Sequence, residues 1–183
     1  CLDGANVGYI KAKDQAGQTA VLVERAFSAQ SAGQLDLAMT YLMEAQKNYE
    51  VAEDAFEINM NYVSIAGLFN TMKRYEEAAE YLDKAADFLL SSDDDDHAIY
   101  FYLIRGENNV DLGDIQEGIS DYENAFRLAQ KHTFLTDVAG SGLALGDIYL
   151  KNNLIEKAKF YYDAALESAT ILKGAYITAA ARS

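Results

Sequence analysis

The sequence predicts an all-α fold in which four helical hairpins stack into a solenoid. Three observations predict it. A set of small and large apolar residues recurs every 40 residues, the apolar residues within each unit follow the α-helical period, and no segment alternates convincingly as a strand. The 183 residues are 50% apolar and 24% charged and include no proline, which excludes disordered, collagen-like and disulfide-scaffold proteins.

Four copies of one pattern define the repeat. Each copy has a small residue, a large apolar residue four positions later and an alanine three positions after that, and another small residue lies twelve positions upstream. The copies begin at Ala38, Ala78, Gly118 and Ala158, and the upstream residues are Ala26, Ala66, Gly106 and Gly146. Because small side chains let helix backbones approach closely, these positions are expected at helix crossings.

The elements follow in order along the chain. We expect residues 1–18 to be a leader or the tail of a preceding repeat, then repeats at 19–58, 59–98, 99–138 and 139–170, and then a capping helix or the start of a further repeat at 171–183. The two helices of each repeat are separated at 32–34, 73–74, 112–114 and 152–153 by residues that end helices or tolerate left-handed backbone. Since a lone hairpin cannot bury its apolar face, the hairpins are expected to stack, and the incomplete ends suggest a fragment of a longer solenoid.

This pattern resembles the tetratricopeptide repeat over roughly residues 19 to 170. The second and fourth units carry the resemblance, through Tyr62, Ile65, Ala66, Phe69, Ala78, Leu82 and Ala85, and through Leu145, Gly146, Tyr149, Ala158, Tyr162 and Ala165. The period of 40, the missing proline, and Arg105 and Asn109 in place of apolar residues depart from it. Long-period repeats of this kind are similar to those of bacterial regulatory proteins and kinesin light chains. The resemblance implies a right-handed α-α superhelix that binds proteins and is not an enzyme.

Charge narrows the range of partners and compartments. The 15 basic and 29 acidic residues give a net charge of −14, which disfavours nucleic acid and anionic lipid and favours a neutral or basic protein or peptide, with a homo-oligomer as a further possibility. No apolar run is long enough to cross a membrane, and the single cysteine fits a reducing compartment, so we expect a cytoplasmic protein. The alternative is a lipoprotein anchored through Cys1.

Candidate chemistry is sparse. His97 and His132 belong to no spaced set of ligands, and Gly140, Gly142 and Gly146 follow no strand, so neither a metal site nor a nucleotide loop is expected. The acidic run at 93–96 lacks the spacing of a calcium loop and is interpreted as capping of the following helix. We therefore expect no cofactor and no catalytic residue.

The resemblance places the first helix of each repeat along a concave groove. The residues expected to line it are Val23, Phe27, Gln30, Met60, Val63, Asn70, Tyr100, Leu103, Glu107, Val110, Leu143, Asp147 and Leu150. This groove would be apolar with an acidic edge, and it lacks the basic residues with which the family grips acidic chaperone tails. Either a ligand or neighbouring helices could cover it.

Arg105 and Asn109 add a polar pair to the candidate binding residues. One interpretation is structural, with the arginine reaching a nearby carboxylate, and the other is a polar anchor for a bound peptide. We therefore predict a protein-interaction module that binds a peptide or protein segment in the groove, as part of a larger protein. The alternatives are the peptide-sensing domain of a bacterial transcription regulator and a structural or oligomerisation scaffold.

Overall fold

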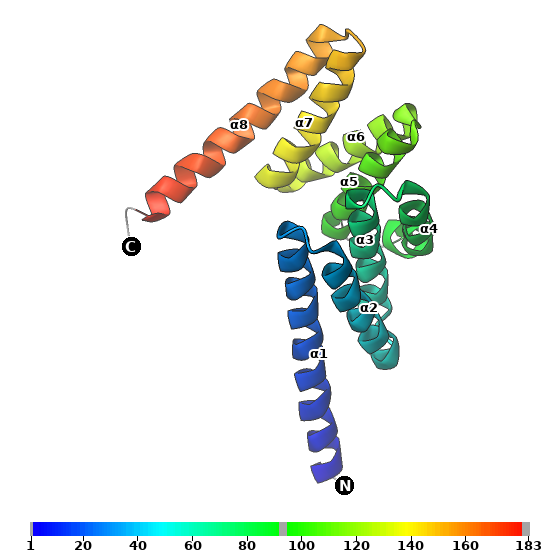
Figure 1. The fold of residues 1–183 in the computed structure, drawn as a ribbon. Helices are drawn as coiled ribbons and strands as arrows, with labels where there is room; N and C mark the ends of the chain where they lie inside the picture. Colours follow the sequence, from blue (N-terminus) through cyan, green and yellow to red (C-terminus); the bar gives the residue numbers. More distant parts are fainter. Residues whose placement is uncertain (1, 92–94, 181–183) are drawn as a thin grey trace. The chain divides into compact units, whose positions relative to one another are not determined.

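The protein is entirely helical in the part of the chain that the computed structural model describes, which is the backbone of residues 2–91 and 95–180 and the side chains of residues 16–91 and 95–174. Eight α-helices lie in these residues (Figure 1). They are α1 (Leu2–Ser31), α2 (Leu35–Ala52), α3 (Ala55–Thr71), α4 (Tyr75–Ser91), α5 (Asp95–Leu112), α6 (Ile115–His132), α7 (Leu135–Lys151) and α8 (Ile155–Ala180).

The chain divides into two compact units, residues 1–88 and 89–183, and the division falls in the last turn of α4. In unit 1, α1 packs on α2 and α2 on α3, while in unit 2 the successive pairs from α5 to α8 pack on one another. The α3–α4 pair is joined by ring contacts such as Phe69 with Tyr81, whose centroids lie 5.6 Å apart. The helices thus form four hairpins, each with a first helix (α1, α3, α5 or α7) and a second helix (α2, α4, α6 or α8).

The turn inside each hairpin has the same backbone form. One residue with positive φ stands between the two helices in every case: Gly33 at 75°, Lys73 at 59°, Gly113 at 97° and Asn153 at 57°. In the first hairpin the amide of Gln34 donates to the carbonyl of Ala29 (2.8 Å) and that of Gly33 to Gln30 (2.9 Å). This pair of bonds is the Schellman closure of a helix, so the first helices end here without proline.

The small residues of the repeat lie in the core, as their pattern predicts. Ala38, Ala78 and Ala158 are at most 2% exposed. In unit 2 the buried cluster is built from α5, α6, α7 and α8 around Phe126, Leu145 and related side chains. The core formed at these positions is mainly apolar, but it also encloses some polar side chains, among them Asn61, Asn108 and Asp121.

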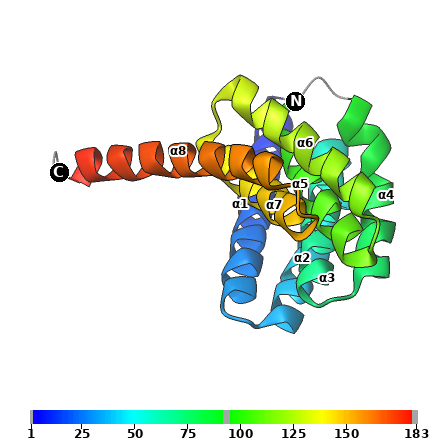
Figure 2. The same ribbon diagram turned by 90° about the horizontal axis from the view of Figure 1, so that it is seen from above.

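The two terminal helices are longer than the internal ones. Residues 2–18, expected as a leader, continue into α1 without a break, and the boundary expected after residue 170 lies inside α8. Figures 1 and 2 both show the second half of α8 running past the end of α7. The expected limits at 59, 99 and 139 fall four residues after the first residues of α3, α5 and α7, because the sequence pattern marks helix crossings and not turns.

Candidate functional site

Unit 1 carries the first six residues expected in the groove. Phe27 of α1 is 44% exposed, and Val23, Gln30 and Met60 are half-buried. Gln30 Nε2 donates to Thr71 Oγ1 at 2.9 Å, which ties the end of α1 to the end of α3. The remaining two, Val63 and Asn70, are 0% and 5% exposed, so they are enclosed by the fold and leave Phe27 as the most accessible of the set.

Unit 2 carries the other expected groove residues, on α5 and α7. On α7, Leu143 (53%), Asp147 and Leu150 (48%) are exposed and follow one another at helical spacing, so they share one face. The α5 residues at the corresponding repeat positions are Leu103, Glu107 and Val110; Glu107 is exposed, and Leu103, Val110 and the nearby Tyr100 are half-buried. The result on α7 is an apolar face with a carboxylate at its centre.

The carboxylate on this face is held in place from α8. Tyr162 donates its hydroxyl hydrogen to Asp147 Oδ1 at 2.6 Å, and this hydrogen bond raises the pKa of Tyr162. The counterpart pair forty residues earlier is Glu107 and Tyr122, where burial and then the nearby Glu107 charge raise the pKa of the tyrosine. Both acids therefore lie beside neutral phenols, and they leave a negative surface.

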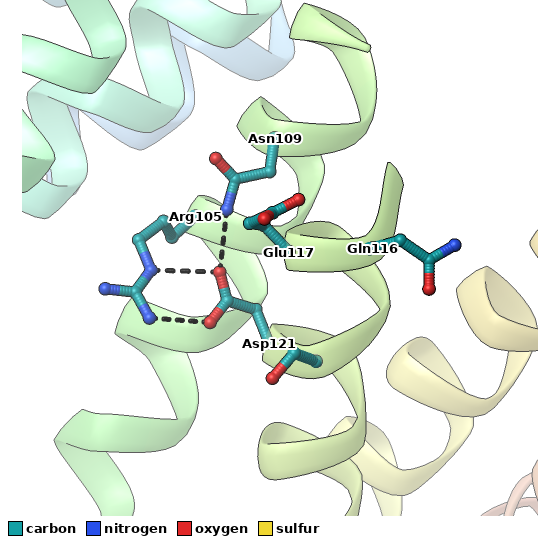
Figure 3. Close-up of a pocket in the computed structure, with 6 residues that line it drawn as sticks. Arg105, Asn109, Gln116, Glu117 and Asp121 are labelled. Carbon is teal, nitrogen blue, oxygen red and sulfur yellow. Dashed lines mark hydrogen bonds and ion pairs between the residues drawn. The ribbon is translucent and has the colours of Figure 1, made fainter. Parts of the chain in front are cut away.

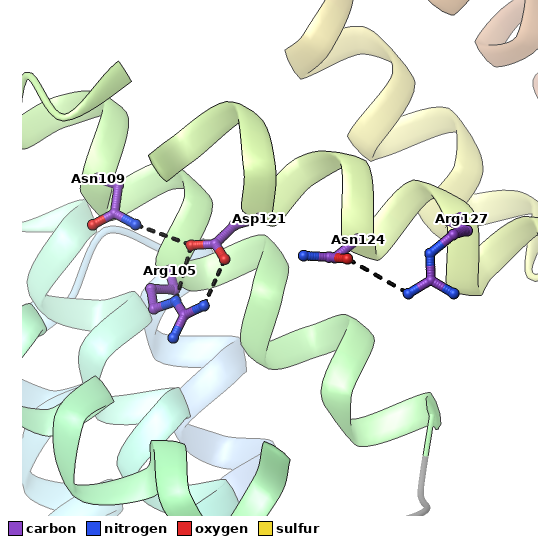
Figure 4. Close-up of polar contacts among 5 residues, drawn as sticks. All are labelled: Arg105, Asn109, Asp121, Asn124 and Arg127. Carbon is purple, nitrogen blue, oxygen red and sulfur yellow. Dashed lines mark hydrogen bonds and ion pairs between the residues drawn. The ribbon is translucent and has the colours of Figure 1, made fainter. Parts of the chain in front are cut away.

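Arg105 and Asn109 converge on a carboxylate that the sequence interpretation did not identify. Arg105 Nε and Nη2 donate to the two oxygens of Asp121 at 2.9 and 2.6 Å, and Asn109 Nδ2 donates to Oδ2 at 2.9 Å (Figures 3 and 4). The guanidinium also lies 4.8 Å from the centre of the Phe101 ring. Asp121 is 5% exposed and Arg105 30%, so this pair joins α5 to α6 within one hairpin, as the structural interpretation predicts.

In the second and fourth hairpins the same place holds a pair of aromatic rings. Phe69 packs on Tyr81 in the second hairpin, and Tyr149 stacks on Tyr161 in the fourth at 5.5 Å and 9°. Asp121 occupies the repeat position of Tyr81 and Tyr161. Asn109 occupies that of Phe69 and Tyr149. Asn109 and Asp121 are polar where the residues forty positions before and after them are aromatic, and this shared departure was the signal that could have identified Asp121.

An open hollow of about 510 Å³ lies beside the ion pair. Its lining consists of Arg105, Asn109, Gln116, Glu117, Ser120 and Asp121. Figure 3 shows Arg105 and Asn109 turned toward Asp121, with Gln116 pointing away. On the same helix, Arg127 contacts Asn124 separately (Figure 4). Because Arg105 and Asp121 neutralise each other here, the exposed carboxylate of Glu117 supplies the remaining charge of the hollow, which is negative.

Asp95 of the acidic run and His132 take part in one contact between α5 and α6. Asp95, in the first turn of α5, accepts from Lys131 Nζ at 2.5 Å and lies 2.8 Å from His132 Nε2, and these contacts lower the pKa of its carboxyl. His132 also stacks on Phe134. His97 lies half-buried in the first turns of α5. Asp93, Asp94 and Cys1 lie outside the described residues.

Gly140, Gly142 and Gly146, where no nucleotide loop was expected, lie inside α7. Gly142 faces the backbone of Tyr161 and Gly146 faces the ring of Tyr162, so these two glycines serve close helix packing. Among the side chains at 16–91 and 95–174, no three His, Cys, Asp or Glu residues are grouped so that they could hold a metal ion. Within the described residues no helix combines the length and the apolar character needed to cross a bilayer.

Comparison with known proteins identifies the repeat. The sequence model of the tetratricopeptide repeat matches residues 61–88 and 143–170, which lie in the second and fourth hairpins. No curated protein matches the chain significantly. The crystal structure of BtubC (BKLC) from P. vanneervenii is similar, with a TM-score of 0.69 at 19% identity over 85% of this chain and 65% of that one. That likeness shows a shared helical-repeat fold, and this chain spans 65% of the length of that relative. The second and fourth hairpins therefore carry tetratricopeptide repeats, a repeat type of protein-interaction and scaffold modules.

Proposed function

We propose that this chain is a protein-interaction module that binds a peptide or protein segment along its first helices and performs no catalytic step. The exposed face of α7 carries the proposal. Leu143 and Leu150, both about half exposed, flank Asp147 on that face, although neighbouring Leu145 is fully buried. Two accessible leucines, two turns apart on one face of a helix, form a surface suited to an apolar ligand.

The partner's chemistry follows from the side chains on this face. Leu143 and Leu150 would accept apolar anchors, which usually supply most of the affinity at such interfaces. Asp147 and Glu107 would pair with an arginine or lysine of the ligand. The net charge of −14 agrees with a neutral or basic partner and would speed its association.

Unit 1 supplies a second proposed binding surface, which carries less charge than the surface on α7. Phe27 occupies the repeat position of Glu107 and Asp147, and Val23, Gln30 and Met60 lie near it in the repeat register. Val63 and Asn70 are withdrawn from this proposed surface because they are buried. A ligand segment here would be held mainly through the exposed ring of Phe27.

The proposal is tested with peptides selected on the purified chain from a random phage-displayed library. Fluorescence anisotropy would then compare variants with the unmodified chain. Leu150→Asp should weaken binding about tenfold or more, because losing one apolar anchor costs roughly 1.5–3 kcal/mol. The matched control is Ile171→Asp, which changes an equally exposed residue on α8 outside the surface. Equal affinity of the two variants would contradict the proposal.

The Arg105→Ala variant, in the same assay, distinguishes a structural role of Arg105 from a role in binding the peptide. The buried Asp121 would lose its charged partner and keep the hydrogen bond from Asn109, so the melting temperature should fall. The cost should lie below the about 3–5 kcal/mol typical of a fully buried pair, because Arg105 is 30% exposed. Peptide affinity should be unchanged. Lost affinity with an unchanged melting temperature would instead make Arg105 a ligand anchor.

A further inference from the structure

One surface position of the second helices is covered wherever another hairpin follows within the same unit. In unit 2, Phe126 of α6 is 5% exposed, and its Cε2 lies 3.4 Å from where a Cβ on Gly142 of α7 would stand. In unit 1, the corresponding residue of α2 is Gln46, also 5% exposed, and its side-chain oxygen accepts from Asn61 Nδ2 of α3 at 2.8 Å. This position is therefore where a second helix receives the next first helix.

On α8 the same position is open. Leu166 stands forty residues after Phe126 and is 68% exposed. One turn further, Ala169 is exposed although its counterpart Ala129 is 0% exposed. Leu166 and Ala169 therefore give α8 an exposed apolar surface at the position where α2 and α6 receive the next helix.

The complementary position on the first helices is open on α1. Asn61 of α3 donates to Leu42 and Gln46 of the preceding α2 and is 3% exposed, and Ser141 at the same repeat position of α7 is 0% exposed. Phe101 of α5, at the same repeat position, is 0% exposed. Val21 of α1 holds this position and is 43% exposed. One chain therefore carries both halves of the interface that joins its own hairpins.

The charges beside the two open faces are complementary. Asp163 of α8 corresponds to Glu123 of α6, and Glu123 accepts a hydrogen bond of 2.8 Å from Tyr149 of α7. On α1, the residue that corresponds to Tyr149 is Ala29, and Arg25 lies one turn before it. Stacking in the register of α6 on α7 would therefore bring Arg25 close to Asp163, where opposite charges favour the correct alignment.

We propose that α8 of one copy binds α1 of a second copy, in the register by which α6 binds α7, so that copies associate head to tail. The interface is the continuation of one already made twice within the chain, by α2 with α3 and by α6 with α7. It uses a different surface on each partner, so it leaves one face open at either end of every assembly. Association should then grow with protein concentration and not stop at a dimer.

Sedimentation velocity of the 183-residue chain over a range of concentrations tests this directly. The unmodified chain should show species that become larger as concentration rises. Leu166→Glu and Val21→Glu should each remain monomeric, because each variant has lost one half of the interface. An equimolar mixture of the two should form dimers and nothing larger, since each variant keeps the face that the other lacks.

Ile171→Glu is the matched control on α8. Ile171 is 50% exposed, and its counterparts Val51 and Lys131 are exposed in hairpins whose stacking face is covered, so it lies outside that face. This variant should associate like the unmodified chain, and circular dichroism should show equal helicity in all variants. A chain that stays monomeric at every concentration would overturn the proposal. So would undiminished association of Val21→Glu, which would indicate pairing of α8 with α8.

Discussion

At the scale of single residues, the two side chains that meet at each helix crossing are matched in size. In the third and fourth hairpins the small residue of the first helix is glycine, and it faces a tyrosine ring of the second helix, Tyr122 or Tyr162. In the first two hairpins the small residue is alanine and the position sixteen residues later is a leucine. The smaller glycine is thus paired with the larger tyrosine, and the larger alanine with the smaller leucine. The total volume of the pair therefore differs less between hairpins than the volume of either residue does.

Gly146→Ala should disturb this fit. The added Cβ would lie 2.5–2.9 Å from three ring atoms of Tyr162, whose hydroxyl is held by Asp147. Overpacking costs about 1–3 kcal/mol, while alanine gains roughly 1 kcal/mol in helix propensity. We expect a net loss of about 0–2 kcal/mol in unfolding free energy, measured by urea denaturation followed by circular dichroism.

Two further variants decide the cause of that loss. Adding Tyr162→Leu to Gly146→Ala recreates the alanine and leucine pair of the second hairpin, Ala66 and Leu82, and should recover part of the stability. Gly140→Ala, in the same helix with open space around its added Cβ, should stabilise the protein by about 0.5–1 kcal/mol. A Gly146→Ala protein as stable as the Gly140→Ala protein would show that Tyr162 moves aside freely.

At the scale of elements, the sequence predicts the helices better than the surfaces between them. The turns at 33, 73, 113 and 153 could be predicted because glycine, asparagine and helix-ending residues act locally. The burial of Val63 and Asn70 could not be predicted from the sequence, since it depends on which helices cover α3. Likewise, the partner of Arg105 comes from α6, and only the packing of the hairpin brings Asp121 to it.

Three helices of unit 2 meet at one carboxylate, and this contact should respond to alkaline pH. Tyr149 of α7 and Tyr161 of α8 both donate to Glu123 Oε1 of α6, at 2.8 and 3.2 Å. Burial and then Glu123 raise the pKa of Tyr161 to about 12, and burial and the bond to Glu123 also raise that of Tyr149. A phenol can donate only while it is protonated.

The sign of the effect follows from these raised pKa values. The folded state holds the phenolic proton more tightly than the unfolded state, whose tyrosine pKa is 10.0. The stabilisation is therefore complete below pH 10 and is lost as the pH rises toward 12. Urea denaturation across this range should show a less steep loss of unfolding free energy for Tyr161→Phe than for the unmodified chain. Identical slopes would contradict a role of this contact.

At the scale of the whole molecule, charge repulsion should outweigh the few surface ion pairs. The chain has 29 acidic and 15 basic residues. Among the described side chains, the pairs Arg74 with Glu77 and Lys159 with Asp163 are exposed, and such pairs contribute at most about 1 kcal/mol each. Salt weakens both the repulsion between acidic side chains and the attraction within ion pairs. Because acidic residues are in excess, salt should reduce the repulsion more than the attraction.

The melting temperature should therefore rise with added sodium chloride at pH 7. Screening shortens the range of repulsion from about 30 Å at 0.01 M salt to about 10 Å at 0.1 M. A gain of 1 kcal/mol would correspond to roughly 2–4 °C for a chain of this size. Circular dichroism melts should use the Leu166→Glu variant, so that head-to-tail association does not contribute. A melting temperature that falls with salt would mean that the attractive pairs dominate, and Lys159→Ala, which removes one exposed pair, should then reduce the fall.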